Sequence, residues 1–265
     1  MELIITYFGA LIIGLILGLM GGGGSILTVP LLVYGLGIDP VIATGYSLFI
    51  VGMTSGFGSI QNYYKDNLSV KGALFIAIPS LITVYITRRY IVPAIPEVII
   101  ETENFTLTKD TFIMALFAVM MLLAALSMLT KQVKEKKKQQ AKPNRYIYIL
   151  PYIICVGMLT GIVGAGGGFL IIPLLVFFAG LPMKKAVGTS LLIITINSLI
   201  GFAGDIQNIS VDWAFLLSFT VFSIFGIFAG TYIQRFVNEV QLKKGFGIFI
   251  LLMACFILTK EFLGF

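Results

Sequence analysis

Apolar runs close to 20 residues long recur along this chain of 265 residues, with short polar stretches between them. Leu3–Met20, Val41–Ile60 and Leu68–Thr87 are each long enough to cross the hydrocarbon core of a bilayer as an α-helix. Because 58% of the residues are apolar and only 11% are charged, a soluble globule could not cover this much apolar surface. The runs do not alternate with a period of two, which disfavours a membrane β-barrel. The predicted fold class is an all-α polytopic membrane protein with 8–10 membrane segments.

Several function classes are disfavoured by what the sequence lacks. It has no histidine, which removes catalytic sites and metal sites that need an imidazole. Cys155 and Cys255 lie in apolar runs, and we interpret them as buried small side chains rather than a disulfide or a metal site. Seven of the 18 basic residues fall in Lys131–Arg145, so the net charge of +6 does not indicate a nucleic-acid partner. We expect no enzyme activity and no cofactor.

The two halves of the chain are copies of each other. A shift of 143 residues aligns Gly18–Gly58 with Gly161–Gly201 without a gap, and 17 of the 41 positions are identical. Many of the identities are glycine, proline or serine, which a shared apolar composition would not place so regularly. We therefore divide the chain into a first membrane repeat (1–130), a basic linker (131–145) and a second membrane repeat (146–265).

Basic residues predict the orientation of the repeats, because cytoplasmic loops are enriched in Lys and Arg. Suppose the first two segments of each half return the chain to its starting side, either by crossing twice or as a V that meets near the bilayer centre. Three further spans then follow, the halves are inverted, and 14 of the 18 basic residues lie inside. Parallel repeats of four spans place only 10 inside. We predict inverted-topology repeats in the cell (inner) membrane, with a cytoplasmic linker and both termini outside.

Each half carries a glycine run directly before a short apolar segment. Gly21–Ser25 precedes Ile26–Val33, and Gly164–Gly168 precedes Phe169–Val176. Broken backbone is tolerated at membrane depth only where it is buried in protein or lines a cavity. The helix N-terminus that follows favours an anion. Matched, glycine-interrupted short segments in inverted halves are typical of the central site of a secondary transporter. The alternative is that the glycines only let helices pack closely.

Hydroxyl and amide side chains in the next span of each half are further candidates for this site. Ser47 and Ser190 occupy matched motifs and could donate to a ligand or bond back to their own helix. Asn197 lies mid-span, as an interhelical contact or a site residue. The candidate substrate-binding residues are Gly21, Gly22, Gly23, Gly24, Ser25, Ser47, Gly164, Ala165, Gly166, Gly167, Gly168, Thr189, Ser190 and Asn197. Ser25 could instead cap its helix.

Charged residues lie only near the ends of the apolar runs. Asp205 could couple transport to protons, although a solvated loop carboxylate is the plainer interpretation. Arg88 and Arg89 end a span on the predicted outer side, where we expect them to reach toward the lipid headgroups.

The chain resembles the sulfite exporter TauE/SafE family of membrane proteins. The resemblance rests on Gly161–Leu175 (GIVGAGGGFLIIPLL), on Ala186–Leu191 (AVGTSL) and on Gly226–Arg235 (GIFAGTYIQR). It implies a secondary transporter, an exporter of sulfite, a sulfonate or a similar small sulfur-containing anion, which works by alternating access and in which a proton or ion gradient could drive export. A passive anion channel and a non-transport membrane protein are the alternatives. The first half departs from the pattern, with Tyr46 where Thr189 stands and Ser25 where Gly168 stands.

Overall fold

The computed structural model describes residues 2–102, 105–130, 146–177, 180–234, 236 and 239–263. It is mostly helical (84%). Contacts divide the chain into two compact units. The first comprises Met1–Val92 and Lys138–Arg235, and the second comprises Pro93–Lys137 and Phe236–Phe265.

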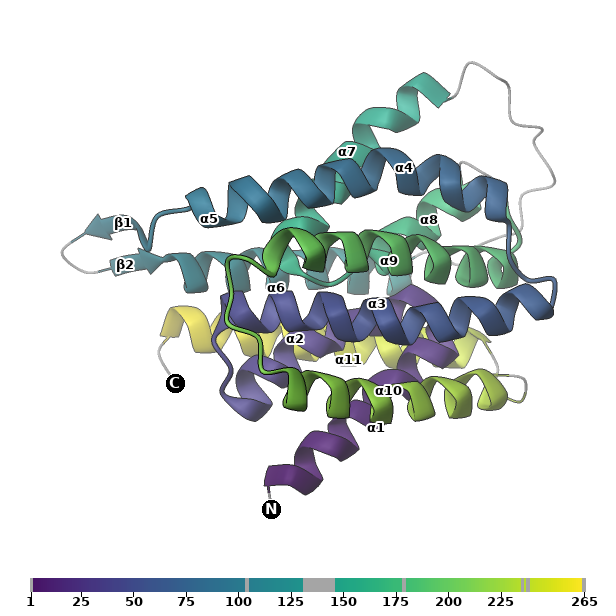
Figure 1. Cartoon of the computed structure of the whole chain (residues 1–265), viewed down its shortest axis with the longest axis horizontal. Helices are drawn as coiled ribbons and strands as arrows, with labels where there is room; N and C mark the ends of the chain where they lie inside the picture. The colour runs from purple at the N-terminus through teal and green to yellow at the C-terminus, as the bar shows by residue number, and fades with distance from the viewer. Residues whose placement is uncertain are drawn as a thin grey trace. The chain divides into compact units, whose positions relative to one another are not determined.

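Helices build the whole described part of the first unit, and Figure 1 shows their order along the chain. Its elements are α1 (Glu2–Met20), the 3-10 helix η1 (Gly21–Leu27), α2 (Thr28–Pro30), the π-helix η2 (Leu31–Gly35), α3 (Pro40–Tyr64), α4 (Val70–Ile86), the π-helix η3 (Thr87–Ile91), α7 (Tyr146–Val163), α8 (Gly168–Phe177), α9 (Met183–Asp205) and α10 (Trp213–Ile233). Within the described residues, six helical segments of the chain are long and apolar enough to cross a membrane.

Polar residues mark where the long helices of this unit begin. Asp39 caps α3 by accepting hydrogen bonds from the backbone N–H groups of Val41 and Ile42. Ser69 caps α4 through the N–H of Gly72, and Asp212 caps α10. These caps satisfy backbone donors that would otherwise be left unpaired at the first turn.

The first glycine run turns the chain back on itself. Gly21 and Gly164 have left-handed φ angles of 62° and 73°, which glycine adopts without strain. Within this run, a Cβ at Gly24 would lie 2.5 Å from the backbone N of Leu17. Gly9, near the start of α1, packs against the side chain of Leu31. In a continuous helix Gly9 and Leu31 would be about 33 Å apart. Because they are in contact, the segment from α1 to η2 forms a V.

Contacts between helices recur at the 143-residue shift, with the halves exchanged. Gly14 of α1 packs against the backbone of Ser223 in α10. Gly157 of α7, the counterpart of Gly14, packs against the backbone of Ser80 in α4, the counterpart of Ser223. The small side chains let the helix backbones approach closely, as is common in membrane proteins.

The counterpart helices α3 and α9 lie side by side and run in opposite directions. Gly52 faces Leu199, and Gly56 faces Thr195, so moving forward along α3 moves backward along α9. A hydrogen bond of 3.1 Å joins the hydroxyls of Ser55 and Thr195 across this interface.

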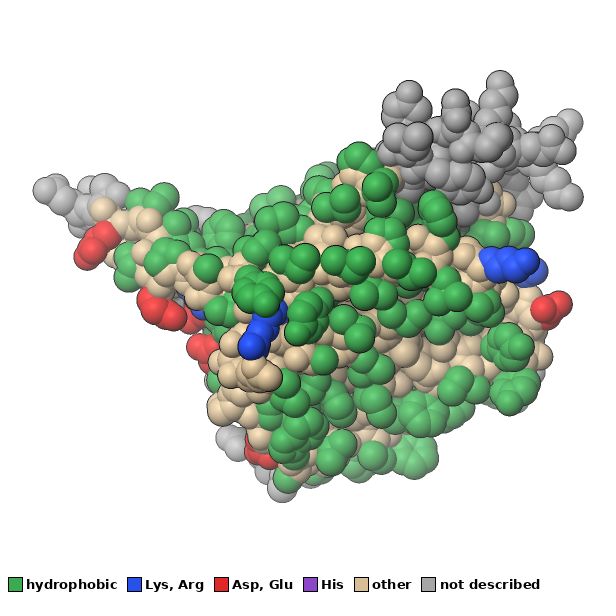
Figure 2. Space-filling model, turned by 45° about the horizontal axis from the view of Figure 1, so that its top comes forward, with side chains coloured by type: hydrophobic (Ala, Val, Ile, Leu, Met, Phe, Trp, Pro, Cys, Tyr) green, Lys and Arg blue, Asp and Glu red, His purple; other side chains and the backbone are tan. Residues whose placement is uncertain are grey.

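Large apolar side chains cover much of the face shown in Figure 2. On α4 alone, Phe75, Ile78 and Ile82 are each about half exposed. Such a surface suits contact with lipid chains. Cys155 and Cys255 are free and exposed, so the prediction that both are buried is wrong. They occupy outward positions on their helices, where apolar composition does not distinguish core from lipid.

The second unit contains the one departure from an all-α fold in the described residues. Strands β1 (Val98–Thr102) and β2 (Phe105–Thr108) form an antiparallel pair in the segment between α5 and α6. Its β-branched and aromatic residues favour strands. The short α5 (Val92–Ala94) precedes the strands, and α6 (Lys109–Thr130) packs against α11 (Glu239–Leu263).

Candidate functional site

The two glycine runs meet each other inside the first unit. A Cβ added at Gly22 would overlap the backbone of Gly168, and a Cβ added at Gly168 would overlap Gly22. The side chain of Ile194, in α9, packs against both glycines. All residues of the two runs from Gly21 to Ser25 and from Gly164 to Gly168 are buried. The two predicted runs, which include Gly23 and Ala165, are thus brought together.

The predicted polar residues make mostly local or interhelical bonds. Ser25 donates to the carbonyl of Gly22 at 2.8 Å, so it does not cap a helix. Ser190 bonds back to the carbonyl of Val187. Asn197 accepts a hydrogen bond of 2.9 Å from Ser80 of α4. Four buried hydroxyls have no hydrogen-bond partner in the described part of the chain: those of Thr28, Ser47, Thr87 and Ser198.

A hydroxyl at matched positions of α3 and α9 accepts a hydrogen bond from the residue that caps a helix of the other half: the cap of α10 for α3, and the cap of α4 for α9. Tyr46 accepts a hydrogen bond of 2.6 Å from the backbone N–H of Asp212, which caps α10. Thr189, its counterpart, accepts one of 3.0 Å from the N–H of Ser69, which caps α4. The departure of Tyr46 from the second-half pattern therefore preserves the contact. Thr189 is a structural acceptor here.

We expect Tyr46→Phe to lower the free energy of unfolding by about 1–3 kcal/mol, because it leaves a backbone N–H without its acceptor in a part-buried position. The hydroxyl also donates to the carbonyl of Ser210 at 3.3 Å, and this bond would be lost as well. Chemical unfolding of the purified protein in detergent measures the change. Tyr64→Phe, at the exposed far end of α3, is the control and should leave stability unchanged. Equal stability of the two variants would contradict the prediction.

A buried ion pair lies beside the second glycine run. The Nη1 atom of Arg88 is 3.1 Å from Oδ2 of Asp205, and the two side chains are 0% and 1% exposed. The same nitrogen donates to Oγ1 of Thr44 at 3.1 Å, and Nη2 donates weakly to the carbonyl of Ile162 at 3.5 Å. A Cβ at Gly164 would lie 2.7 Å from Nη2. The pair thus touches the point where the second run begins.

This pair corrects two expectations. We expected Arg88 to reach toward the headgroups and Asp205 to be a solvated loop carboxylate, and both are wrong. The π-helix η3 changes the register of its side chains, so Arg88 faces the interior while Arg89 stays half-buried. Asp205 is the last residue of α9 and points into the core.

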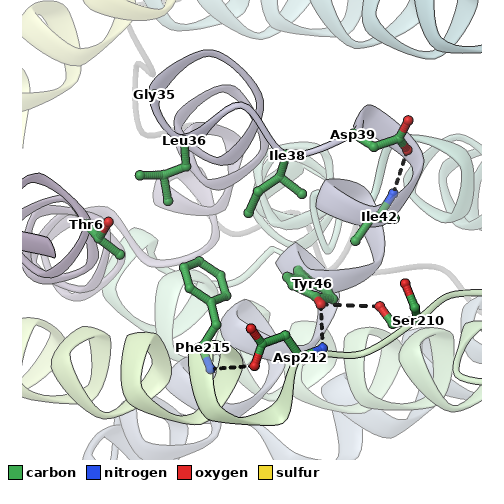
Figure 3. Close-up of a pocket in the computed structure, with 10 residues that line it drawn as sticks. All are labelled: Thr6, Gly35, Leu36, Ile38, Asp39, Ile42, Tyr46, Ser210, Asp212 and Phe215. Carbon is green, nitrogen blue, oxygen red and sulfur yellow. Dashed lines mark hydrogen bonds between the residues drawn. The ribbon is translucent and has the colours of Figure 1, made fainter. Parts of the chain in front are cut away.

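A pocket of about 630 Å³ opens near the same end of α3 and is drawn in Figure 3. Its polar lining includes Asp39, Tyr46, Ser210 and Asp212. Figure 3 shows the Tyr46 hydroxyl between Ser210 and the backbone nitrogen of Asp212, at one wall of the pocket.

Comparisons with known proteins agree on the kind of protein. A family model described as Sulfite exporter TauE/SafE matches residues 6–257. A probable membrane transporter protein of Xylella fastidiosa (strain 9a5c) is 28% identical over 265 residues, which cover 98% of this chain and 96% of that protein. The probable membrane transporter protein YunE of Bacillus subtilis (strain 168) is 25% identical over 275 residues, covering 96% and 97%. No solved structure gives a significant match. Because the family match spans nearly the whole chain, this protein belongs to the sulfite exporter TauE/SafE family, a family of membrane transporters.

Proposed function

We propose that this membrane transporter is a secondary exporter of a small sulfur-containing anion, such as sulfite or a sulfonate, and that it works by alternating access. The family supports transport. The observation that carries the proposal is the meeting of the two glycine runs, since close-packed, left-handed glycines present backbone N–H groups to a ligand without side chains in the way.

The architecture is two inverted repeats, 1–130 and 146–265, joined by a cytoplasmic linker. Three observations support it. Counterpart helices α3 and α9 are antiparallel, contacts recur with the halves exchanged, and the first glycine run forms a V. Two copies related by an axis perpendicular to α3 and α9 would have opposite orientations in a membrane that these helices cross. The distribution of Lys and Arg along the sequence predicts the same inverted orientation.

The substrate site lies where the runs meet, and the structure represents a state in which they are closed on each other. Gly22 and Gly168 touch, so an anion enters only when the halves separate. Backbone N–H groups after Gly21–Gly24 and Gly164–Gly168 hold the anion. Among the polar candidates, Ser47 has a buried hydroxyl with no partner in the described residues and is the side chain most available to donate. The pocket beside Tyr46 is the extracytoplasmic exit.

The test is binding and flux with one panel of anions: sulfite, thiosulfate, sulfate, methanesulfonate and chloride. Purified protein should be stabilised against heat by a sulfur anion, by about 2.7 kcal/mol at 100 times its Kd. Proteoliposomes should show saturable flux that accelerates when the same anion is present on the opposite side, because alternating access exchanges substrate. Flux without saturation or exchange would indicate a channel. Absence of both binding and flux would overturn the proposal.

A further inference from the structure

We propose that Arg88 is a substrate-binding residue and that Asp205 is its internal competitor, a carboxylate that holds the guanidinium until the transported anion replaces it. The inference rests on the proposed function and adds a charged group to the glycine site. It also names the class of substrate, an oxyanion.

The position of Arg88 carries the first step. Its side chain is fully buried and lies against Gly164, where the left-handed glycines of the second run begin. Gly164, Gly166 and Gly167 all have positive φ, the conformation that gathers successive N–H groups around an anion. Arg88 therefore adds a full positive charge to a backbone already suited to an anion.

The hydrogen bonds of Arg88 carry the second step. Nη1 and Nη2 have partners, but Nε is buried with no hydrogen-bond partner among the described residues. The hydroxyl of Ser198, also buried and unpartnered there, would lie 2.7 Å from a Cβ at Gly166 of the same run. Leaving buried donors unsatisfied costs free energy. An oxyanion bound beside the second glycine run would accept hydrogen bonds from both Arg88 Nε and the Ser198 hydroxyl.

The internal repeat places uncharged residues at the position that corresponds to the ion pair. At the 143-residue shift, Arg88 corresponds to Thr231, and Asp205 corresponds to Asn62. The packing around these positions is conserved, since Gly45 contacts Asp205 and Gly188 contacts Asn62. The uncharged residues at this position have hydrogen-bond partners, since Asn62 donates to the carbonyl of Gly58 at 2.9 Å and Thr231 donates to Oε1 of Gln61. Each repeat contributes one residue to each of the two positions, and the position formed by Asn62 and Thr231 is buried without charges.

Anion exchange is the chemistry that this arrangement allows. Breaking a buried ion pair leaves an uncompensated charge, but replacing one anion by another keeps Arg88 neutralised throughout. The planar fork of a guanidinium matches two oxygens of a sulfite, sulfonate or carboxylate, and chloride offers no such pair. Asp205 ends α9 next to exposed Ile206, Gln207 and Asn208, so a displaced carboxylate has solvent within reach.

The test compares sulfite and chloride binding to wild type, Asp205→Asn, the double variant Arg88→Gln/Asp205→Asn, and Arg89→Gln, by titration of purified protein in detergent. Arg89 is the matched control, since it carries the same charge one residue away and is half-buried. We expect Asp205→Asn to bind sulfite at least about tenfold more tightly, and the double variant at least about tenfold more weakly, than wild type. Arg89→Gln should bind like wild type.

Several results would overturn the proposal. Sulfite affinity unchanged or weakened in Asp205→Asn would remove Asp205 as a competitor. Wild-type affinity in the double variant would remove Arg88 from the site while leaving sulfite export by the glycine runs intact. If the wild type neither binds nor transports any anion of the panel, the proposed function fails together with this inference.

Discussion

Replacing Gly168 by valine should prevent the two glycine runs from closing on each other, and it should abolish anion flux. The new Cβ would overlap the backbone of Gly22 and the side chain of Ile194. Neither neighbour can move without a large cost, because the Gly22 contact is with backbone and the Ile194 side chain packs against both runs. Overpacking of this kind costs up to about 3 kcal/mol, and more where the backbone must shift. The measurements are chemical unfolding in detergent and sulfite flux in proteoliposomes.

The matched control is Gly245→Ala, within α11. Nothing lies within 4 Å of a Cβ at this glycine, and its φ angle is not left-handed. Alanine in a helix interior is favoured over glycine by about 1 kcal/mol, so this variant should be as stable as wild type or slightly more so, with full flux. If Gly168→Val had wild-type stability and flux, the runs could not be the point where the transporter closes.

Much of the fold could be predicted from the sequence, because apolar runs and an internal repeat are properties of the chain itself. The spacing of Gly21–Ser25 and Gly164–Gly168 located the break in each half. Whether each break crosses or turns back depends on contacts such as Gly9 with Leu31, which lie far apart in the sequence. No periodicity of the apolar residues reports such a contact.

The buried ion pair could not be predicted in the same way. Arg88 and Asp205 end their apolar runs, where hydropathy is the same for a headgroup contact and for an interior position. They are 117 residues apart. One signal was available: the repeat assigns both charges to neutral counterparts, Thr231 and Asn62. Charges that one copy carries and the other lacks are candidates for function rather than for folding.

The free energy of unfolding of Arg88 and Asp205 variants should show how strongly the two side chains depend on each other. Arg88→Gln leaves the carboxylate of Asp205 buried without its partner, and Asp205→Asn leaves the guanidinium so. Each single change should lower the free energy of unfolding by about 3–5 kcal/mol, measured without added anion. The double variant buries neither charge and should recover most of that loss, since the uncharged counterparts Asn62 and Thr231 are buried at the repeat-related position. The coupling follows from the double-mutant cycle.

Sulfite should then rescue only one of the single variants. In Asp205→Asn the anion can take the place of the missing carboxylate, so saturating sulfite should restore most of the lost stability. In Arg88→Gln the stranded charge is negative, and an anion beside it is repelled, so sulfite should restore none. An ion pair that served only to join η3 and α9 would give two single variants with the same response to sulfite. Opposite responses would therefore identify Arg88 as the group that meets the substrate, and additive losses in the double variant would contradict the coupling on which this argument depends.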